Sequence, residues 1–215
     1  MRSLPIFLLC PLLLCAAGNI HTVEYPPSTV AGELIYGVTY RLWIPDGVKT
    51  IRAVIVHQHG CGVGANRSGR TAADDLHWQA LAKKWDAALL EPSYHTAEGQ
   101  DCRQWSDPRN GSEQTYLRAL SDLAKQSGHA ELVQAPWCLW GHSGGGTWAS
   151  LIQTLHPERI AGIWLRSGTA FEYWEKGEIP KPVIPDAVYR IPVMCNPGVK
   201  EKGHERNNPS WTGTR

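Results

Sequence analysis

The sequence predicts an α/β protein, a three-layer αβα sandwich built on a mostly parallel sheet. Short apolar runs typical of buried parallel strands alternate with stretches of helical periodicity. The chain has 215 residues, 42% of them hydrophobic, which suits a single domain with a substantial core. Lys and Arg number 21 against 20 Asp and Glu, so the net charge of +1 offers no electrostatic basis for binding nucleic acid or an anionic membrane.

The first 17 residues are typical of a secretory signal peptide. Arg2 supplies a short positive region, residues 6–17 are apolar, and small residues precede Gly18. A stretch this short does not span a bilayer, which needs about 20 residues. We therefore expect a secreted or periplasmic protein with no membrane span, whose residues 18–215 form one domain.

Strands and helices alternate along the mature chain. A β-rich segment at 36–44 ends in a strong turn. Helices are expected over 72–85, with Leu76, Leu81 and Trp85 at helical spacing, over about 110–128, and over about 144–156. Buried strands are expected at 51–56, 87–90 (closed by Pro92), 137–140, 160–165 and 191–194, and a long loop or cap at 171–189.

Export permits disulfide bonds between the four cysteines of the mature chain, which allow three pairings. Cys61 and Cys102 lie in glycine-rich or polar loops, whereas Cys138 and Cys195 lie in apolar runs typical of buried free thiols. The favoured disulfide is therefore Cys61–Cys102. No C-x-x-C spacing indicates zinc or a redox dithiol, and no motif calls for a cofactor or a metal.

The motif with the clearest chemistry is Gly141-His142-Ser143-Gly144-Gly145, a G-x-S-x-G sequence between a predicted strand and a predicted helix. In that context the serine sits on a strained turn that holds its hydroxyl clear of the sheet. Glycines flank it because side chains would clash in so tight a turn. The N–H of Gly144 would lie at a helix N-terminus, where it stabilises developing negative charge. The alternative is a glycine-rich turn with an idle serine.

A second glycine-rich loop, His59-Gly60-Cys61-Gly62, follows the predicted strand at 51–56. A loop at this place contributes the second N–H of an oxyanion hole, here from Cys61 or Gly62. His57 and His59 also raise the possibility of a metal pair, but no acid or third histidine follows closely.

The strand order, this loop and the motif at 141–145 resemble the α/β-hydrolase superfamily, in its serine esterase, lipase and peptidase branches, over about residues 33–201. The resemblance implies a triad in the chain order serine, acid, histidine. Ser143 would be the nucleophile. Glu201 stands where the acid is expected, with a solvated glutamate as the alternative, and His204 is the one histidine beyond it.

The expected last strand before the histidine is missing from the pattern. One interpretation is a hydrolase truncated at its C-terminus. Another is that a histidine elsewhere serves as the base, for which His95 is the candidate. Tyr94, His95 and Trp105 are candidate substrate walls, with ordinary loop packing as the alternative.

The resemblance favours a carboxylic ester hydrolase acting on a small-molecule or polymer ester. Two alternatives stay open: a non-catalytic binding protein on a hydrolase scaffold, and a peptidase or acyltransferase using the same site. Nothing in the sequence indicates an oligomeric state.

Overall fold

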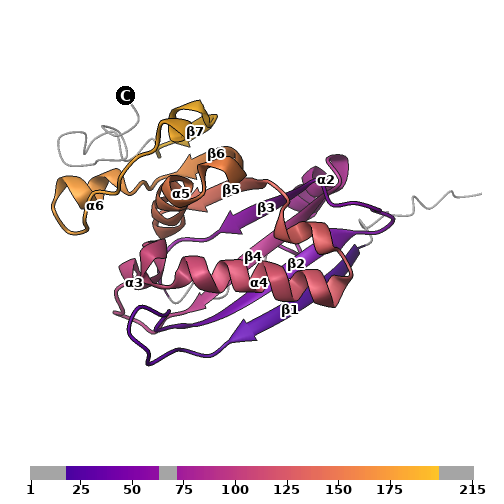
Figure 1. Cartoon of the computed structure of the whole chain (residues 1–215), viewed down its shortest axis with the longest axis horizontal. Coiled ribbons are helices and arrows are strands. Elements are labelled where there is room, and N and C mark those ends of the chain that lie inside the picture. The colour runs from indigo at the N-terminus through magenta and orange to yellow at the C-terminus, as the bar shows by residue number, and fades with distance from the viewer. Residues whose placement is uncertain (1–17, 63–71, 199–215) are drawn as a thin grey trace, which may run out of the picture.

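The computed structural model describes residues 18–62 and 72–198. They form a seven-stranded sheet in the order β1-β2-β4-β3-β5-β6-β7 (Figure 1). Strands β1 and β2 pair antiparallel, as do β2 and β4, and every other pairing is parallel. The strands are β1 (Gly18–Tyr25), β2 (Gly37–Pro45), β3 (Ala53–Gln58), β4 (Ala87–His95), β5 (Trp137–His142), β6 (Ile160–Arg166) and β7 (Val193–Asn196).

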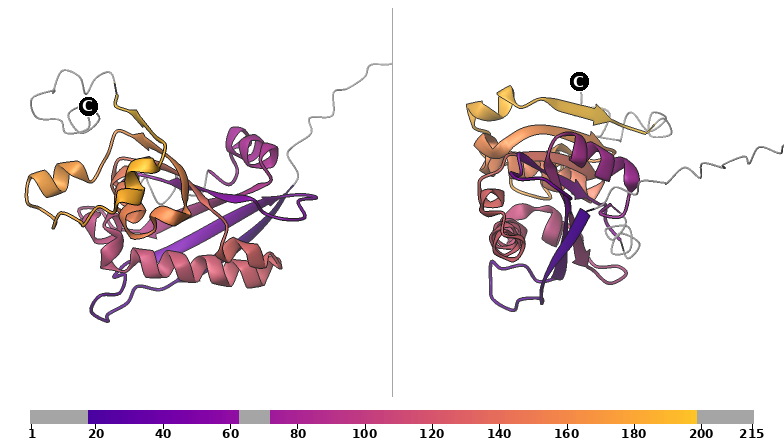
Figure 2. Two further views of the ribbon diagram at one scale, coloured as in Figure 1. Left: turned by 45° about the horizontal axis from the view of Figure 1, so that its top comes forward. Right: turned by 90° about the vertical axis from the view of Figure 1, so that its right-hand side faces the viewer.

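Helices lie on both faces of this sheet, which gives the predicted three-layer α/β fold. Figure 2 shows α2 on the opposite side of the sheet from α4 and α5. The α-helices are α2 (Leu76–Lys84), α3 (Arg103–Ser106), α4 (Ser112–Ser127), α5 (Gly144–Leu155) and α6 (Phe171–Glu175). Short 3₁₀ turns are η1 (Pro108–Asn110), η2 (Ala130–Val133), η3 (Pro157–Arg159) and η4 (Asp186–Arg190).

Side-chain alternation along the central strands divides the core between the two faces. In β3, Val54 and Val56 join the larger apolar cluster, beneath α4 and α5, while Ile55 joins a smaller cluster with Ala82 of α2. Leu139 of β5 also belongs to the larger cluster. Because the parallel strands are apolar on both faces, a covering layer is needed on each side.

Three details of the predicted elements were wrong. Strand β1 was not expected at all. Strand β4 does not end at Pro92 but continues to His95, because its antiparallel pairing with β2 runs as far as His95. Its parallel pairing with β3 ends earlier, at Leu90, so the proline removes no hydrogen bond from that ladder. The helix expected from residue 72 begins only at Leu76, because Asp75 is its N-cap. The Asp75 side chain accepts hydrogen bonds from two backbone N–H groups of the first turn.

The α2 face of the sheet carries an apolar groove with a volume of about 520 Å³. Trp85 of α2 is 54% exposed, Trp164 of β6 is 38% exposed and Met194 of β7 is 50% exposed. Leu76 and Leu81 are also exposed, so the helical spacing of this segment does not mark a buried face. The described residues therefore cover this face only in part. The residues lining the apolar groove include Trp78, Leu81, Trp85, Cys138, Trp140, Ile163, Trp164, Pro192, Val193 and Met194.

Within the two described ranges, every helix is too short or too polar to cross a bilayer.

Candidate active site

Parallel strand order brings three loops to one edge of the sheet. The last residue of β3, Gln58, pairs with Gly141, and His142 at the end of β5 pairs with Arg166 at the end of β6. The carboxyl ends of these strands are therefore adjacent, and the segments that follow them meet. In open α/β sheets this edge is where ligand sites form.

The turn at residues 141–145, here called the elbow, holds Ser143 in a strained conformation. Ser143 has φ 51° and ψ −118°, a region that a residue with a Cβ rarely adopts. Its N–H donates to the Arg166 carbonyl (3.0 Å), and its own carbonyl accepts from Thr147 N–H (3.1 Å). Ser143 is the N-cap of α5, yet its hydroxyl makes no capping hydrogen bond and the side chain is part-exposed. The hydroxyl therefore lies at a helix N-terminus without being used to cap it.

Glycine is required at Gly145 because the elbow packs directly on the end of β3. A Cβ built on Gly145 would overlap the carbonyl oxygens of Gln58 and His59 and lie 2.8 Å from the Gln58 carbonyl carbon. These are backbone atoms, which have no rotamer by which to move aside. The tight contact fixes the elbow against the neighbouring loop.

Substituting Gly145→Ala is expected to lower the free energy of unfolding by about 1–3 kcal/mol, despite the better helix propensity of alanine. Urea denaturation followed by circular dichroism measures this loss. Gly162→Ala in β6 is the matched control, because a Cβ there would meet its nearest neighbour, the Pro192 carbonyl oxygen, at an ordinary 3.7 Å. Equal stabilities for the two variants would contradict the packing argument.

The loop at residues 59–62, called the oxyanion loop after its expected role, lies against the elbow. A Cβ built on Gly60 would lie 3.1 Å from the Ser143 Cβ and 3.1 Å from Nδ1 of His142. Cys61 and Gly62 follow at once and are exposed. The structure thus brings together four residues that the sequence analysis named: Ser143, Gly144, Cys61 and Gly62.

Two histidines lie at the end of β3: His59 is buried and His57 is half-buried. His59 Nδ1 lies 2.6 Å from the Gly60 carbonyl oxygen, and the ring packs against Tyr94 and Trp105. His57 stacks on Trp140 with ring centroids 4.0 Å apart. Burial disfavours the charged imidazolium and lowers the pKa of each residue to about 4. Both rings are therefore neutral near pH 7. Since the carbonyl only accepts, His59 Nδ1 carries the proton.

Tyr94 and Trp105 lie in the hydrophobic core and do not form an exposed substrate wall. Their side chains are 0% and 1% exposed, and the rings stack with centroids 4.5 Å apart. The Trp105 ring contacts the elbow, because a Cβ built on Gly144 would lie 3.5 Å from it. His95 is exposed at the end of β4, where Nε2 lies 2.8 Å from Thr39 Oγ1.

The predicted acid and base, Glu201 and His204, lie outside the described residues, as does the predicted signal peptide. The predicted Cys61–Cys102 disulfide is confirmed, with Cα atoms 5.6 Å apart. Cys138 and Cys195 are free thiols whose pKa is raised by burial. In the part of the chain that the structure describes, no cluster of three His, Cys, Asp or Glu side chains is arranged to hold a metal ion.

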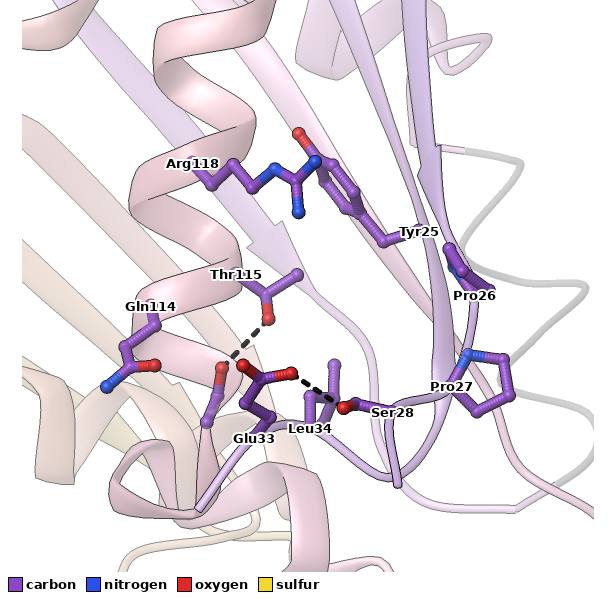
Figure 3. Close-up of a pocket in the computed structure, with 10 residues that line it drawn as sticks. Tyr25, Pro26, Pro27, Ser28, Glu33, Leu34, Gln114, Thr115 and Arg118 are labelled. Carbon is purple, nitrogen blue, oxygen red and sulfur yellow. Dashed lines mark hydrogen bonds between the residues drawn. The ribbon is translucent and has the colours of Figure 1, made fainter. Parts of the chain in front are cut away.

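The larger cavities lie away from the elbow. One, with a volume of about 370 Å³, is formed by α4, the end of β1 and the segment that follows β1. Figure 3 shows the Arg118 guanidinium beside the Tyr25 ring, 4.6 Å from its centroid, and Glu33 accepting a hydrogen bond from Ser28. A cavity of only about 10 Å³ adjoins the elbow, lined by Ser167, Gly168 and Asn196 among others. Volume alone therefore does not single out the elbow.

Comparison with known proteins matches no family model and no curated protein sequence. Solved structures do match. Acetyl xylan esterase from Aspergillus awamori has a TM-score of 0.52 at 17% identity, over 73% of this chain and 54% of its own. Poly(aspartic acid) hydrolase-1 from Sphingomonas sp. KT-1 has a TM-score of 0.50 at 19% identity, over 70% and 56%. A ferulic acid esterase has a TM-score of 0.50 at 14% identity, over 72% and 59%.

The strand order, the elbow and these structural neighbours together identify the α/β-hydrolase fold. The chain spans between half and three-fifths of the length of these three structures.

Proposed function

We propose that this protein is a serine hydrolase that cleaves carboxylic esters, with Ser143 as nucleophile. The observation that carries the proposal is the strained Ser143 at the N-terminus of α5, whose hydroxyl is not used for capping. A strained backbone persists only where the surrounding structure holds it, and such strain clusters at functional sites. Gly144 N–H opens the helix, so negative charge is favoured there.

The reaction follows from these positions. Ser143 Oγ attacks the ester carbonyl carbon while a base takes its proton, and the carbonyl oxygen becomes an oxyanion. Gly144 N–H and the N–H of Cys61 or Gly62 stabilise that oxyanion. The alkoxide leaves with a proton from the protonated base, and water then hydrolyses the acyl-enzyme. His204 is proposed as the base and Glu201 as the residue that orients it, both from the sequence pattern.

The structural neighbours support an ester substrate, because acetyl xylan esterase and ferulic acid esterase are named for ester hydrolysis. The Cys61–Cys102 disulfide supports an exported protein, since disulfides persist in oxidising compartments. We accordingly place the enzyme in the secreted or periplasmic fraction, acting on a small-molecule or polymer ester.

A fluorophosphonate probe tests the proposal directly, because it phosphonylates only serines activated as nucleophiles. Labelling of the purified protein is expected to map by mass spectrometry to the peptide containing Ser143, and to disappear in Ser143→Ala. Ser167→Ala is the matched control: Ser167 also has a positive φ (50°) and lies at the end of the adjacent strand, so its variant should still label.

Absence of labelling in the native protein would overturn the hydrolase proposal. Ester binding that survives Ser143→Ala without turnover would then favour a binding protein on this scaffold. Faster product formation with amines or alcohols as acceptors than with water would favour an acyltransferase.

A further inference from the structure

The Cys61–Cys102 disulfide packs on the residue proposed to bind the oxyanion. A Cβ built on Gly144 would overlap the Cys61 sulfur and lie 3.4 Å from the Cys102 sulfur. The Trp105 ring is 3.5 Å away on the same side. The disulfide and this indole therefore form the surface against which the first residue of α5 rests.

One end of the disulfide is firmly anchored. Cys102 is the N-cap of α3, and its carbonyl accepts hydrogen bonds from Trp105 N–H (3.1 Å) and Ser106 N–H (2.9 Å). Trp105 is buried, and its own carbonyl accepts from the Ser112 hydroxyl at 2.6 Å. This hydrogen bond ties α3 to the start of α4.

The other end of the disulfide lies in the exposed oxyanion loop. Among the described residues, no backbone hydrogen bond is made by the N–H groups of Cys61 and Gly62. The covalent link to Cys102 ties the loop that carries these N–H groups to α3, beside Gly144. Preorganised donors are effective because they need no rearrangement as charge develops.

We propose that the Cys61–Cys102 disulfide is a positioning element of the oxyanion hole, which holds the N–H groups of the oxyanion loop in register with Gly144. This rests on the proposed hydrolase function and adds a redox requirement to it. Opening the bond frees the loop from α3 while leaving Ser143 and the elbow intact. The expected defect is in transition-state stabilisation and not in substrate binding.

Reduction tests this in the whole protein. Dithiothreitol donates two electrons and two protons, giving thiols at Cys61 and Cys102 and its own cyclic disulfide. With a p-nitrophenyl ester, kcat is expected to fall roughly 10- to 100-fold, less than the ~10²- to 10³-fold loss that follows removal of an oxyanion donor, with KM changed less than about twofold. The Ki of a phenylboronic acid, whose adduct with serine carries a tetrahedral oxyanion-like centre, should rise by the same factor. Reoxidation should restore both values.

Two sets of variants separate positioning from other effects. Cys138→Ser with Cys195→Ser removes both described free thiols and should respond to the reductant as the native protein does. Cys61→Ser with Cys102→Ser should show the low kcat without reductant, with circular dichroism confirming that it is folded at the assay temperature. A folded, reduced protein that keeps its kcat and boronate affinity would overturn the inference while leaving the hydrolase function standing.

If the oxidised protein neither turns over esters nor labels at Ser143, the proposed function has failed by its own test. Hydrogen exchange then decides the inference. Faster exchange at the amides of residues 60–62 and 144 after reduction supports the positioning role, and unchanged exchange at those amides overturns it.

Discussion

Replacing Ser143 with glycine is expected to abolish ester hydrolysis and, at the same time, to stabilise the fold. Loss of the nucleophile should lower kcat by up to ~10⁶-fold, the scale seen when a catalytic serine is removed. The strain of a side chain at φ 51° is of order 1–3 kcal/mol and disappears with glycine. Against this stands the extra chain entropy of glycine, of order 0.5–1 kcal/mol. The free energy of unfolding should therefore rise by about 1 kcal/mol.

Ser143→Ala is the matched control. It removes the hydroxyl but keeps a Cβ, so the backbone strain stays. Both variants should be inactive, while only the glycine variant should gain stability in urea denaturation. A glycine variant less stable than the alanine variant would contradict the view that the elbow stores strain.

The second large effect is a loss of stability on acidification. Burial lowers the pKa of His57 and of His59 to about 4, whereas in the unfolded chain each titrates near 6.5. Between these values the unfolded state binds protons that the native state does not, so the unfolding free energy falls as the pH falls from about 6.5 to about 4. At roughly 1.4 kcal/mol per pKa unit, each histidine contributes a loss of roughly 3 kcal/mol across that window.

Urea denaturation at half-unit pH intervals measures this slope. His57→Phe keeps a flat ring to stack on Trp140, and His59→Asn keeps a donor for the Gly60 carbonyl. Each variant should lose roughly half of the pH dependence between 6.5 and 4, whatever its stability at pH 7. His129→Asn is the control. His129 lies apart from His57 and His59, with its Nδ1 2.9 Å from Glu131 Oε1, so its replacement should leave this steep acid dependence in place. An unchanged slope in the His57 and His59 variants would rule out buried neutral histidines as its source.

Much of the fold could be predicted because the parallel strands are short apolar runs separated by glycine and proline. The disulfide could be predicted because only two mature cysteines lie outside apolar runs. Strand β1 was missed because its inward residues, His21, Val23 and Tyr25, alternate with polar ones and include a histidine. The weak pattern becomes a strand only through its pairing with β2.

The elbow was predictable because its glycines and serine are consecutive in the chain. The surroundings of the site were harder, because burial depends on distant segments. Tyr94 and Trp105 look like pocket residues in the sequence, yet their stacking together beneath His59 places both in the core. The contact of the Cys61 sulfur with Gly144 joins residues 83 positions apart in sequence, and no local pattern reports it.

In the described part of the chain, the apolar groove along β5, β6 and β7 leaves two tryptophans exposed to water, while four others are buried in the core. The buried tryptophans are Trp43, Trp105, Trp137 and Trp148, and the exposed ones are Trp85 and Trp164. Emission from the buried tryptophans reports on the integrity of the core. Emission from the exposed tryptophans reports on any molecule that covers the groove. Tryptophan fluorescence therefore reports how completely the α2 face of the sheet is covered.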